Sequence, residues 1–269
     1  MQLFSALGYL TRVSNQYMTG RAGSEPIKGA KIMRGIIVMV MFTASLASAA
    51  WSDYEEQREL KLSARDIGTV DIEAGSGSLE ISGVSGADAI AVTATIRVPD
   101  RDDDKARKII ESDLVLTLEK QGDTAVLKAY FKHKLWRMGD SPSVQLVVRM
   151  PDNLNLAVDD GSGFMSVADI SGAIDVEDGS GSITMTNVGG EVQIVDGSGS
   201  ISVDGVGGDI SIDDGSGSIT VRGVAGSVVI DDGSGSINVS EVEQDLIIVD
   251  DGSGGLNFSD IKGRVKKDI

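Results

Sequence analysis

Apolar and polar residues recur in a fixed order along most of the second half of the chain. The segment GSGSI, or a close variant of it, begins at Gly161, Gly179, Gly197, Gly215, Gly233 and Gly252. The spacing between these starts is 18 residues, except for 19 residues before the last one, and an isolated early copy begins at Gly75. Self-similarity at a fixed period is typical of repeat architectures, so the sequence predicts one stacked array.

Each repeat contains two short runs in which apolar and polar residues alternate. The unit 215–232 reads GSGSITVRGVAGSVVIDD, and its apolar positions are Ile219, Val221, Val224, Val228 and Ile230. A period of two is typical of β-strands, and strands this short cannot bury an apolar face alone. Neighbouring units must therefore stack equivalent strands in parallel and share one aliphatic core. The predicted fold is all-β: a parallel β-solenoid, or β-helix, of 18-residue coils with a small α+β insertion.

Glycines mark the predicted corners of the coil. They occupy the first, the third and usually the twelfth position of the unit. Glycine adopts backbone angles that other residues avoid, so all three positions are expected to supply the unusual angles of sharp corners.

The rest of the chain divides around this array. We expect N-terminal strands and a first coil over 50–92, the insertion over 93–143 and solenoid repeats over 144–269. Within the insertion, the run 102–112 (DDDKARKIIES) predicts a short helix with acidic residues at its start. Two alternating runs on either side of Gln121-Gly122-Asp123 predict a pair of strands that lies against one edge of the solenoid or extends it.

The beginning of the chain has the order of a secretory signal peptide. Lys31 and Arg34 precede the apolar stretch 35–46, which is followed by Ala47-Ser48-Ala49. The stretch is shorter than the roughly 20 residues that span a bilayer, so we expect a signal peptide over 33–49 with cleavage after Ala49. Residues 1–32 are expected to be an upstream extension from a start codon assigned too early. An extracytoplasmic location and no transmembrane anchor in the mature chain follow.

The repeats resemble a known family. The run DGSGSITMTNVGGEVQIVDGSGSISVDGVGGDISIDDGSGSI, with the lead-in VQLVVRMPDNLNLAVDDGSG, is similar to bacterial "putative adhesin" β-strand-repeat proteins, a family of unknown function. The resemblance covers the chain from about Leu60 onward and is most specific over 144–261. It implies an exported β-solenoid and brings no catalytic residues.

Composition excludes several kinds of chemistry. The formal net charge is −17, which disfavours nucleic acid as a partner. No cysteine is present, so disulfides and thiolate sites are excluded, and His133 is the only histidine. Between 151 and 261 the only basic residue is Arg222, whereas the active sites of polysaccharide-cleaving β-helices combine clustered acids with cations. We therefore expect no catalytic residues and no cofactor.

Paired acids at the repeat corners are the first candidate for a binding site. Stacked carboxylates repel one another, and a hard cation such as Ca²⁺ could relieve that repulsion. The candidate ligands are Asp213, Asp214, Asp231 and Asp232. The turns lack the encircling oxygens of defined calcium sites, so we expect at most weak, diffuse binding, and turn-forming aspartates explain the pattern without a metal. A row of corner serines could likewise bind a glycan or ice. Tight corners also favour small residues for steric reasons alone, which explains the serines without a ligand.

A basic and aromatic cluster is the second candidate. Its residues are Tyr130, Phe131, Lys132, Trp136 and Arg137. Aromatic and arginine side chains dominate interface hot spots, so the cluster could contact a partner; equally, the aromatics could cover the solenoid.

Three classes of function remain open. The first is an exported structural or interaction protein that presents an acidic, repetitive surface to an envelope or surface protein or a glycan. The second is an envelope accessory or sensor module that binds through the 130–137 cluster. A polysaccharide-active β-helix enzyme is the third and the least favoured.

Overall fold

A computed structural model describes residues 53–99, 102–132 and 141–267 of the 269-residue chain. All of the described residues belong to the unit 35–269. The expected signal peptide (33–49) and the expected upstream extension (1–32) lie outside the described residues.

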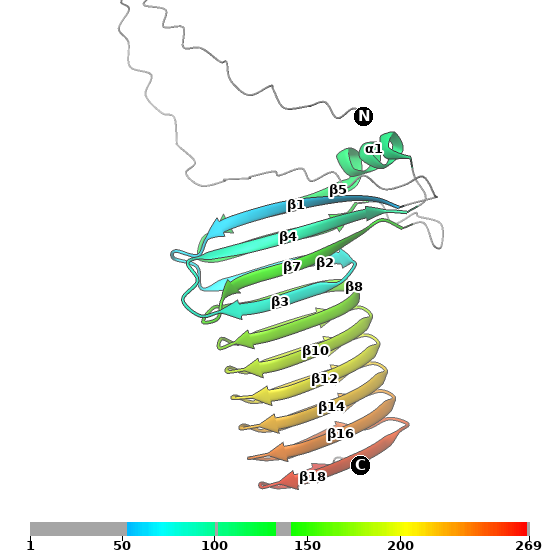
Figure 1. Cartoon of the computed structure of the whole chain (residues 1–269). Coiled ribbons are helices and arrows are strands. Elements are labelled where there is room, and N and C mark those ends of the chain that lie inside the picture. Colours follow the sequence, from blue (N-terminus) through cyan, green and yellow to red (C-terminus); the bar gives the residue numbers. More distant parts are fainter. Residues whose placement is uncertain (1–52, 100–101, 133–140, 268–269) are drawn as a thin grey trace, which may run out of the picture. The chain divides into compact units, whose positions relative to one another are not determined.

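The repeats form a parallel β-solenoid, as the sequence predicts (Figure 1). Each coil contributes one strand to sheet A and one strand to sheet B. The sheet A strands are β10 (Gly181–Val188), β12 (Gly199–Val206), β14 (Gly217–Val224), β16 (Gly235–Val242) and β18 (Gly255–Ile261). The sheet B strands are β9 (Ile174–Asp178), β11 (Val192–Asp196), β13 (Ile210–Asp214), β15 (Val228–Asp232), β17 (Leu246–Asp250) and β19 (Val265–Lys267).

Equivalent residues of successive coils pair directly. In sheet A, Ile201 pairs with Ile219 and Val203 pairs with Val221. In sheet B, Ile212 pairs with Ile230, and this register holds along the stack until it shifts after Ile230, where the last repeat has one extra residue. Like residues therefore lie above like residues, one strand spacing apart.

A non-repeating assembly of strands forms the N-terminal end of the stack. Strand β8 (Asn155–Ile170) passes through both sheets. Sheet A continues from it through β3 (Leu79–Val84), β7 (Ser143–Pro151), β4 (Ala89–Val98) and β1 (Tyr54–Ser63), and the last two contacts are antiparallel. Sheet B continues through β2 (Thr69–Ser76), β6 (Thr124–Phe131) and β5 (Leu114–Gln121).

The expected helix and strand pair lie at this end. Helix α1 (Asp103–Asp113) begins after Asp102, whose carboxylate accepts a hydrogen bond from the Lys105 backbone N–H at 2.9 Å. Its buried residues, Ala106 and Ile110, face the solenoid, and α1 lies at the N-terminal end of the stack in Figure 1. Strands β5 and β6 form an antiparallel hairpin that extends sheet B, so the expectation of an edge extension is confirmed.

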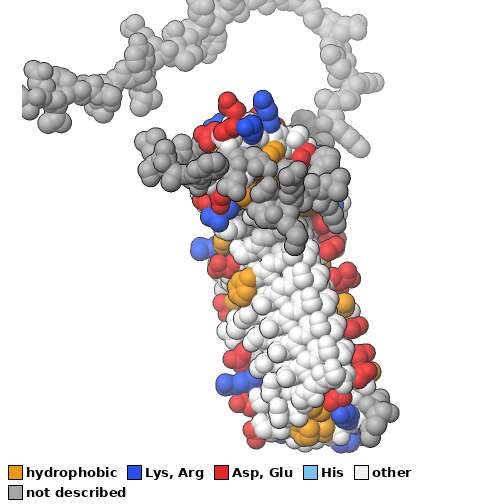
Figure 2. All heavy atoms as spheres, turned by 90° about the vertical axis from the view of Figure 1, so that its right-hand side faces the viewer, with side chains coloured by type: hydrophobic (Ala, Val, Ile, Leu, Met, Phe, Trp, Pro, Cys, Tyr) orange, Lys and Arg blue, Asp and Glu red, His pale blue; other side chains and the backbone are white. Residues whose placement is uncertain are grey.

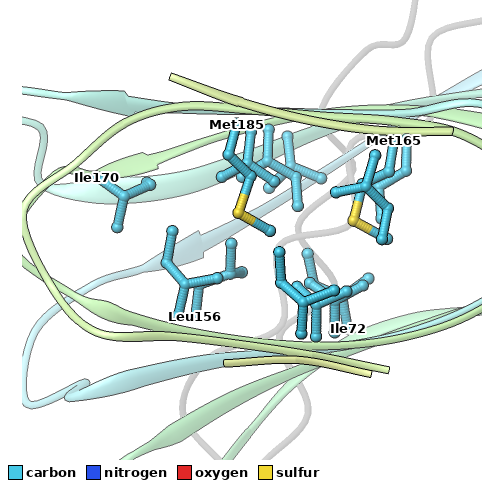
Figure 3. Close-up of a cluster of buried hydrophobic side chains, with 14 of the residues drawn as sticks. Ile72, Leu156, Met165, Ile170 and Met185 are labelled. Atoms are coloured by element: carbon cyan, nitrogen blue, oxygen red, sulfur yellow. The ribbon is translucent and has the colours of Figure 1, made fainter. Parts of the chain in front are cut away.

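The core lies between the two sheets and consists of aliphatic side chains and methionines. Ile72 and Leu156 project from sheet B toward Met165, Ile170 and Met185 of sheet A (Figure 3). The inward positions expected for the 215–232 unit are at most 1% exposed, and they are Ile219, Val221, Val224, Val228 and Ile230. The strand phase read from the sequence is confirmed.

The corner glycines have two different roles, and one part of the sequence expectation is wrong. Of the three glycine positions, the third, represented by Gly217 with a φ of 153°, has a positive φ in successive coils, whereas the first does so only at Gly252. At the first and twelfth positions glycine is required because the backbones of adjacent coils pack closely there. A Cβ on Gly215 would lie 2.5 Å from the Gly197 carbonyl oxygen. The ninth position, which the sequence did not single out, is left-handed in each coil and holds Asp169, Asn187, Gly205, Gly223, Glu241 or Asp260.

Truncation of an inward residue should destabilise the solenoid much more than truncation of its outward neighbour. We expect Val221→Ala to lower the free energy of unfolding by about 1–4 kcal/mol, because it leaves a cavity in the shared core. Thr220→Ala is the matched control on the exposed face and should cost about 0.5 kcal/mol or less. Urea unfolding of both variants measures the difference, and equal losses would contradict the assigned strand phase.

Substitution of a third-position glycine should be worse still. Gly217→Ala combines a disfavoured φ with a Cβ placed 1.5 Å from the Gly199 carbonyl oxygen, so we expect the stack to unfold locally or the chain to misfold. Gly255→Ala is the control, since a Cβ there meets nothing within 4 Å. Thermal unfolding followed by circular dichroism compares the two, and a Gly217→Ala variant as stable as Gly255→Ala would refute the corner geometry.

Candidate functional site

The two sheets present chemically different outer faces. The central outward row of sheet A carries hydroxyl and amide groups and consists of Ser166, Thr184, Ser202, Thr220, Asn238 and Asn257. An outward row of sheet B carries mostly carboxylates, is named the acidic row here, and consists of Glu73, Asp159, Glu177, Asp213, Asp231 and Asp250, with Val195 interrupting it. Between the faces, the glycine and serine corners form a surface of small residues, with acidic side chains along its right-hand edge (Figure 2).

A shallow hollow of about 500 Å³ lies on the outer side of sheet B. Three acids from successive coils line it, Asp175, Glu191 and Asp209, together with amide and hydroxyl groups such as those of Gln193 and Ser211. None of the three acids forms an ion pair with another described residue. The hollow can therefore receive positively charged or hydrogen-bond-donating groups.

A second set of aspartates lies inside the solenoid. One aspartate in each of five successive coils is at most 5% exposed, and together they form what is here called the aspartate column: Asp160, Asp178, Asp196, Asp214 and Asp232. The strand register pairs each member with the next. Burial of a like-charged series is costly unless the groups are neutralised or bonded.

Four of the five column carboxyls accept a hydrogen bond within the turn through one oxygen. The Oδ1 atom of Asp196 accepts a hydrogen bond from the Ser198 backbone N–H at 3.1 Å, and Asp178, Asp214 and Asp232 repeat this turn with their own serines. The Oδ2 atoms of all five are buried without a hydrogen-bond partner among the described residues. The aspartate thus closes the corner with one oxygen and leaves the other in the interior.

The surroundings of the column favour protonated carboxyls. Burial is the largest cause and raises the pKa of all five groups, and carboxylates on adjacent coils raise it further. The serine N–H bonds act in the opposite direction. The pKa of Asp160 rises to about 7.

The four candidate calcium ligands are divided between these two environments. Asp213 and Asp231 belong to the outward acidic row, whereas Asp214 and Asp232 belong to the buried column. No group of three or more His, Cys, Asp or Glu side chains that could hold a metal ion is present in the described ranges. Weak, diffuse calcium binding by these residues stays a prediction. The signal that separates the two environments was available: continuing the alternation of Val228 and Ile230 places Asp232 inward.

The described part of the aromatic cluster lies partly against the solenoid. Phe131 packs against the hydrophobic core, and Tyr130 is half-buried beside Gly75, where a Cβ on that glycine would come within 2.9 Å of the tyrosine Cβ. Lys132 is exposed. Trp136 and Arg137 lie outside the described residues, as does His133.

Comparisons with known proteins match this chain only among solved structures. No protein-family model and no curated protein matches. A "putative cell adhesion protein" from Clostridium sporogenes is 12% identical, with a TM-score of 0.42, over 80% of this chain and 99% of that one. A "putative adhesin" from Bacteroides fragilis is 9% identical, with a TM-score of 0.36, over 79% and 97%.

A third solved structure carries a different label. It is a "putative lipid binding protein" from Parabacteroides distasonis, 15% identical, with a TM-score of 0.30, over 80% of this chain and 97% of that one. Structures named as adhesins are thus among those similar to this chain. The assignment of the solenoid fold itself depends on the strand register described above.

In the part of the chain that the structure describes, no helix is long and apolar enough to cross a bilayer.

Proposed function

We propose that the chain is an exported, non-enzymatic structural or interaction protein that binds a positively charged partner through the acidic face of sheet B. The observation that carries the proposal is the hollow on that face, where Asp175, Glu191 and Asp209 come together from successive coils with no cation among the described residues to neutralise them. A rigid row of like charges that recurs at most coils suits a multivalent contact with a basic surface.

The scarcity of cations supports a binding role over a catalytic one. Arg222, the only basic residue between 151 and 261, lies on sheet A and forms an ion pair with Glu241 at 3.3 Å. Elimination on an acidic sugar chain requires cationic groups that stabilise developing negative charge, and the described acidic face supplies none.

Export is the second part of the proposal. It is supported by the order of basic, apolar and small residues before Ala49 and by the resemblance to exported solenoids. The partner is then a protein with a basic surface in the cell envelope or outside the cell.

The competing proposal is an accessory or sensor module that binds through the 130–137 cluster. The exposed amino group of Lys132 supports it, because that residue is the described basic member of the cluster. The partner in this case would be anionic, so the two proposals predict opposite preferences of charge.

Binding assays with variants of equal charge separate the two proposals. Asp175→Asn, Glu191→Gln and Asp209→Asn together remove the acids of the hollow. Exposed ion pairs contribute about 0.2–1 kcal/mol each, so this variant should bind an immobilised oligolysine peptide roughly 3- to 150-fold more weakly than the unaltered chain.

The control variant combines Glu59→Gln, Glu111→Gln and Asp204→Asn. It also loses three negative charges, but from exposed positions away from the hollow. Because distant, independent sites contribute separately to the binding free energy, its affinity for the peptide should fall less than threefold. Equal losses in the two variants would show that only net charge matters and would refute the assigned face. Binding to dextran sulfate that Lys132→Ala abolishes would favour the 130–137 cluster instead.

A further inference from the structure

The aspartate column brings several carboxyl groups of like charge together in the interior, away from the solvent that screens the acids of the outer faces. Five carboxyl groups lie in the interior, one above another, each at most 5% exposed. Ionised carboxylates at this spacing would each bear the cost of desolvation and the repulsion of two neighbours. A folded stack therefore needs a partner for the Oδ2 atoms.

Side-chain cations do not provide that partner. The charged groups that face the column from neighbouring segments are themselves acids, and they are Asp159, Asp213, Asp231, Asp250 and Asp251. Among the described cations at the C-terminal end, Lys262 pairs with Glu243 and Arg264 with Asp245, and Lys267 forms an ion pair with Asp251 at 2.6 Å. Asp251 immediately precedes the last corner glycine. The lysine thus neutralises the acid that follows the column, not a member of it.

A metal ion does not fit the column either. Calcium requires six to eight oxygen ligands around it, whereas each coil offers the column a single unpaired carboxyl oxygen. The described residues contain no convergent group of acids suited to a metal. A proton needs no such cage, because one oxygen holds it and a second oxygen accepts the resulting bond.

We propose that the column is a proton-binding site, in which neutral carboxyl groups each donate an O–H bond from Oδ2 to the carboxyl of an adjacent coil. The register places paired aspartates on neighbouring parallel strands, about 4.8 Å apart, which is the spacing that stacked asparagine side chains bridge in cross-β ladders. A protonated carboxyl offers one donor and further acceptors, as an amide does, so it can join the same kind of ladder.

The consequence is a solenoid whose folding stability increases as the pH falls. Folding raises the carboxyl pKa values above the unfolded value of about 3.9, reaching about 7 at Asp160. Stability from proton uptake is fully present below the unfolded pKa and is lost as the pH rises through the folded pKa. A carboxyl whose pKa is higher by one in the folded chain changes the unfolding equilibrium constant about tenfold across this window.

Two neighbouring residues provide a matched test. Asp178→Asn replaces a column member with a neutral donor of the same shape, and Glu177→Gln removes one charge from the exposed position beside it. Urea unfolding at pH 5 and pH 8 should show that the unaltered chain is more stable at pH 5. Asp178→Asn should stabilise the chain at pH 8 and lose part of the pH dependence of the unfolding constant, whereas Glu177→Gln should retain that dependence.

Infrared spectroscopy gives a direct readout that does not depend on folding energetics. At pH 6 the unaltered chain should show the C=O stretch of protonated carboxyls, weaker in Asp178→Asn and unchanged in Glu177→Gln. Absence of that band, or identical pH dependence in both variants, would overturn the proposal. Saturable stabilisation by Ca²⁺ at pH 8 that Asp178→Asn abolishes would also overturn it in favour of a cation. Should Asp178→Asn fail to fold, Asp160→Asn at the N-terminal end of the column tests the same point.

Discussion

The structure depends on one constraint: each coil must lie on the next at the spacing of a single β-strand, in register. Two short strands per coil cannot form a stable core, so the inward side chains of Ile219, Val221 and Val228 are buried only because equivalent residues cover them from both sides. The same register aligns the corner glycines, where a side chain would collide with the backbone of the adjacent coil. The repeated sequence is therefore a steric requirement of the stack.

Stacking in register also brings like charges together, and the chain places these charges in two different environments. On the outside, the acidic row faces water, which screens repulsion and leaves the carboxylates available to a basic partner. On the inside, Asp178 and Asp196 each close a corner by accepting a serine N–H bond, and this local benefit brings their second oxygen into the interior. One repeated Asp-Gly-Ser corner thus accounts both for the shape of the coil and for the unusual electrostatics of the column.

Much of this could be predicted from the sequence, because a period of 18 residues and an alternation of two determine both the solenoid and its strand phase. The inward position of Asp232 follows from that alternation once it is continued through the corner. The N-terminal end could not be derived in the same way: β1, β4 and β7 have no repeat, and their antiparallel pairing arises from tertiary contacts. The left-handed ninth position was also hidden, since residues as different as Asn187 and Glu241 occupy it.

The spacing between coils can be measured directly, because the chain contains no cysteine and accepts spin labels only where cysteines are introduced. Labels on Thr184 and Thr220 are two coils apart on the outer side of sheet A, and labels on Thr184 and Asn238 are three coils apart. Electron paramagnetic resonance should give mean separations that differ by about one strand spacing, ~5 Å, with the shorter near ~10 Å. Separations that do not increase coil by coil, or that exceed these values by far, would contradict the in-register stack.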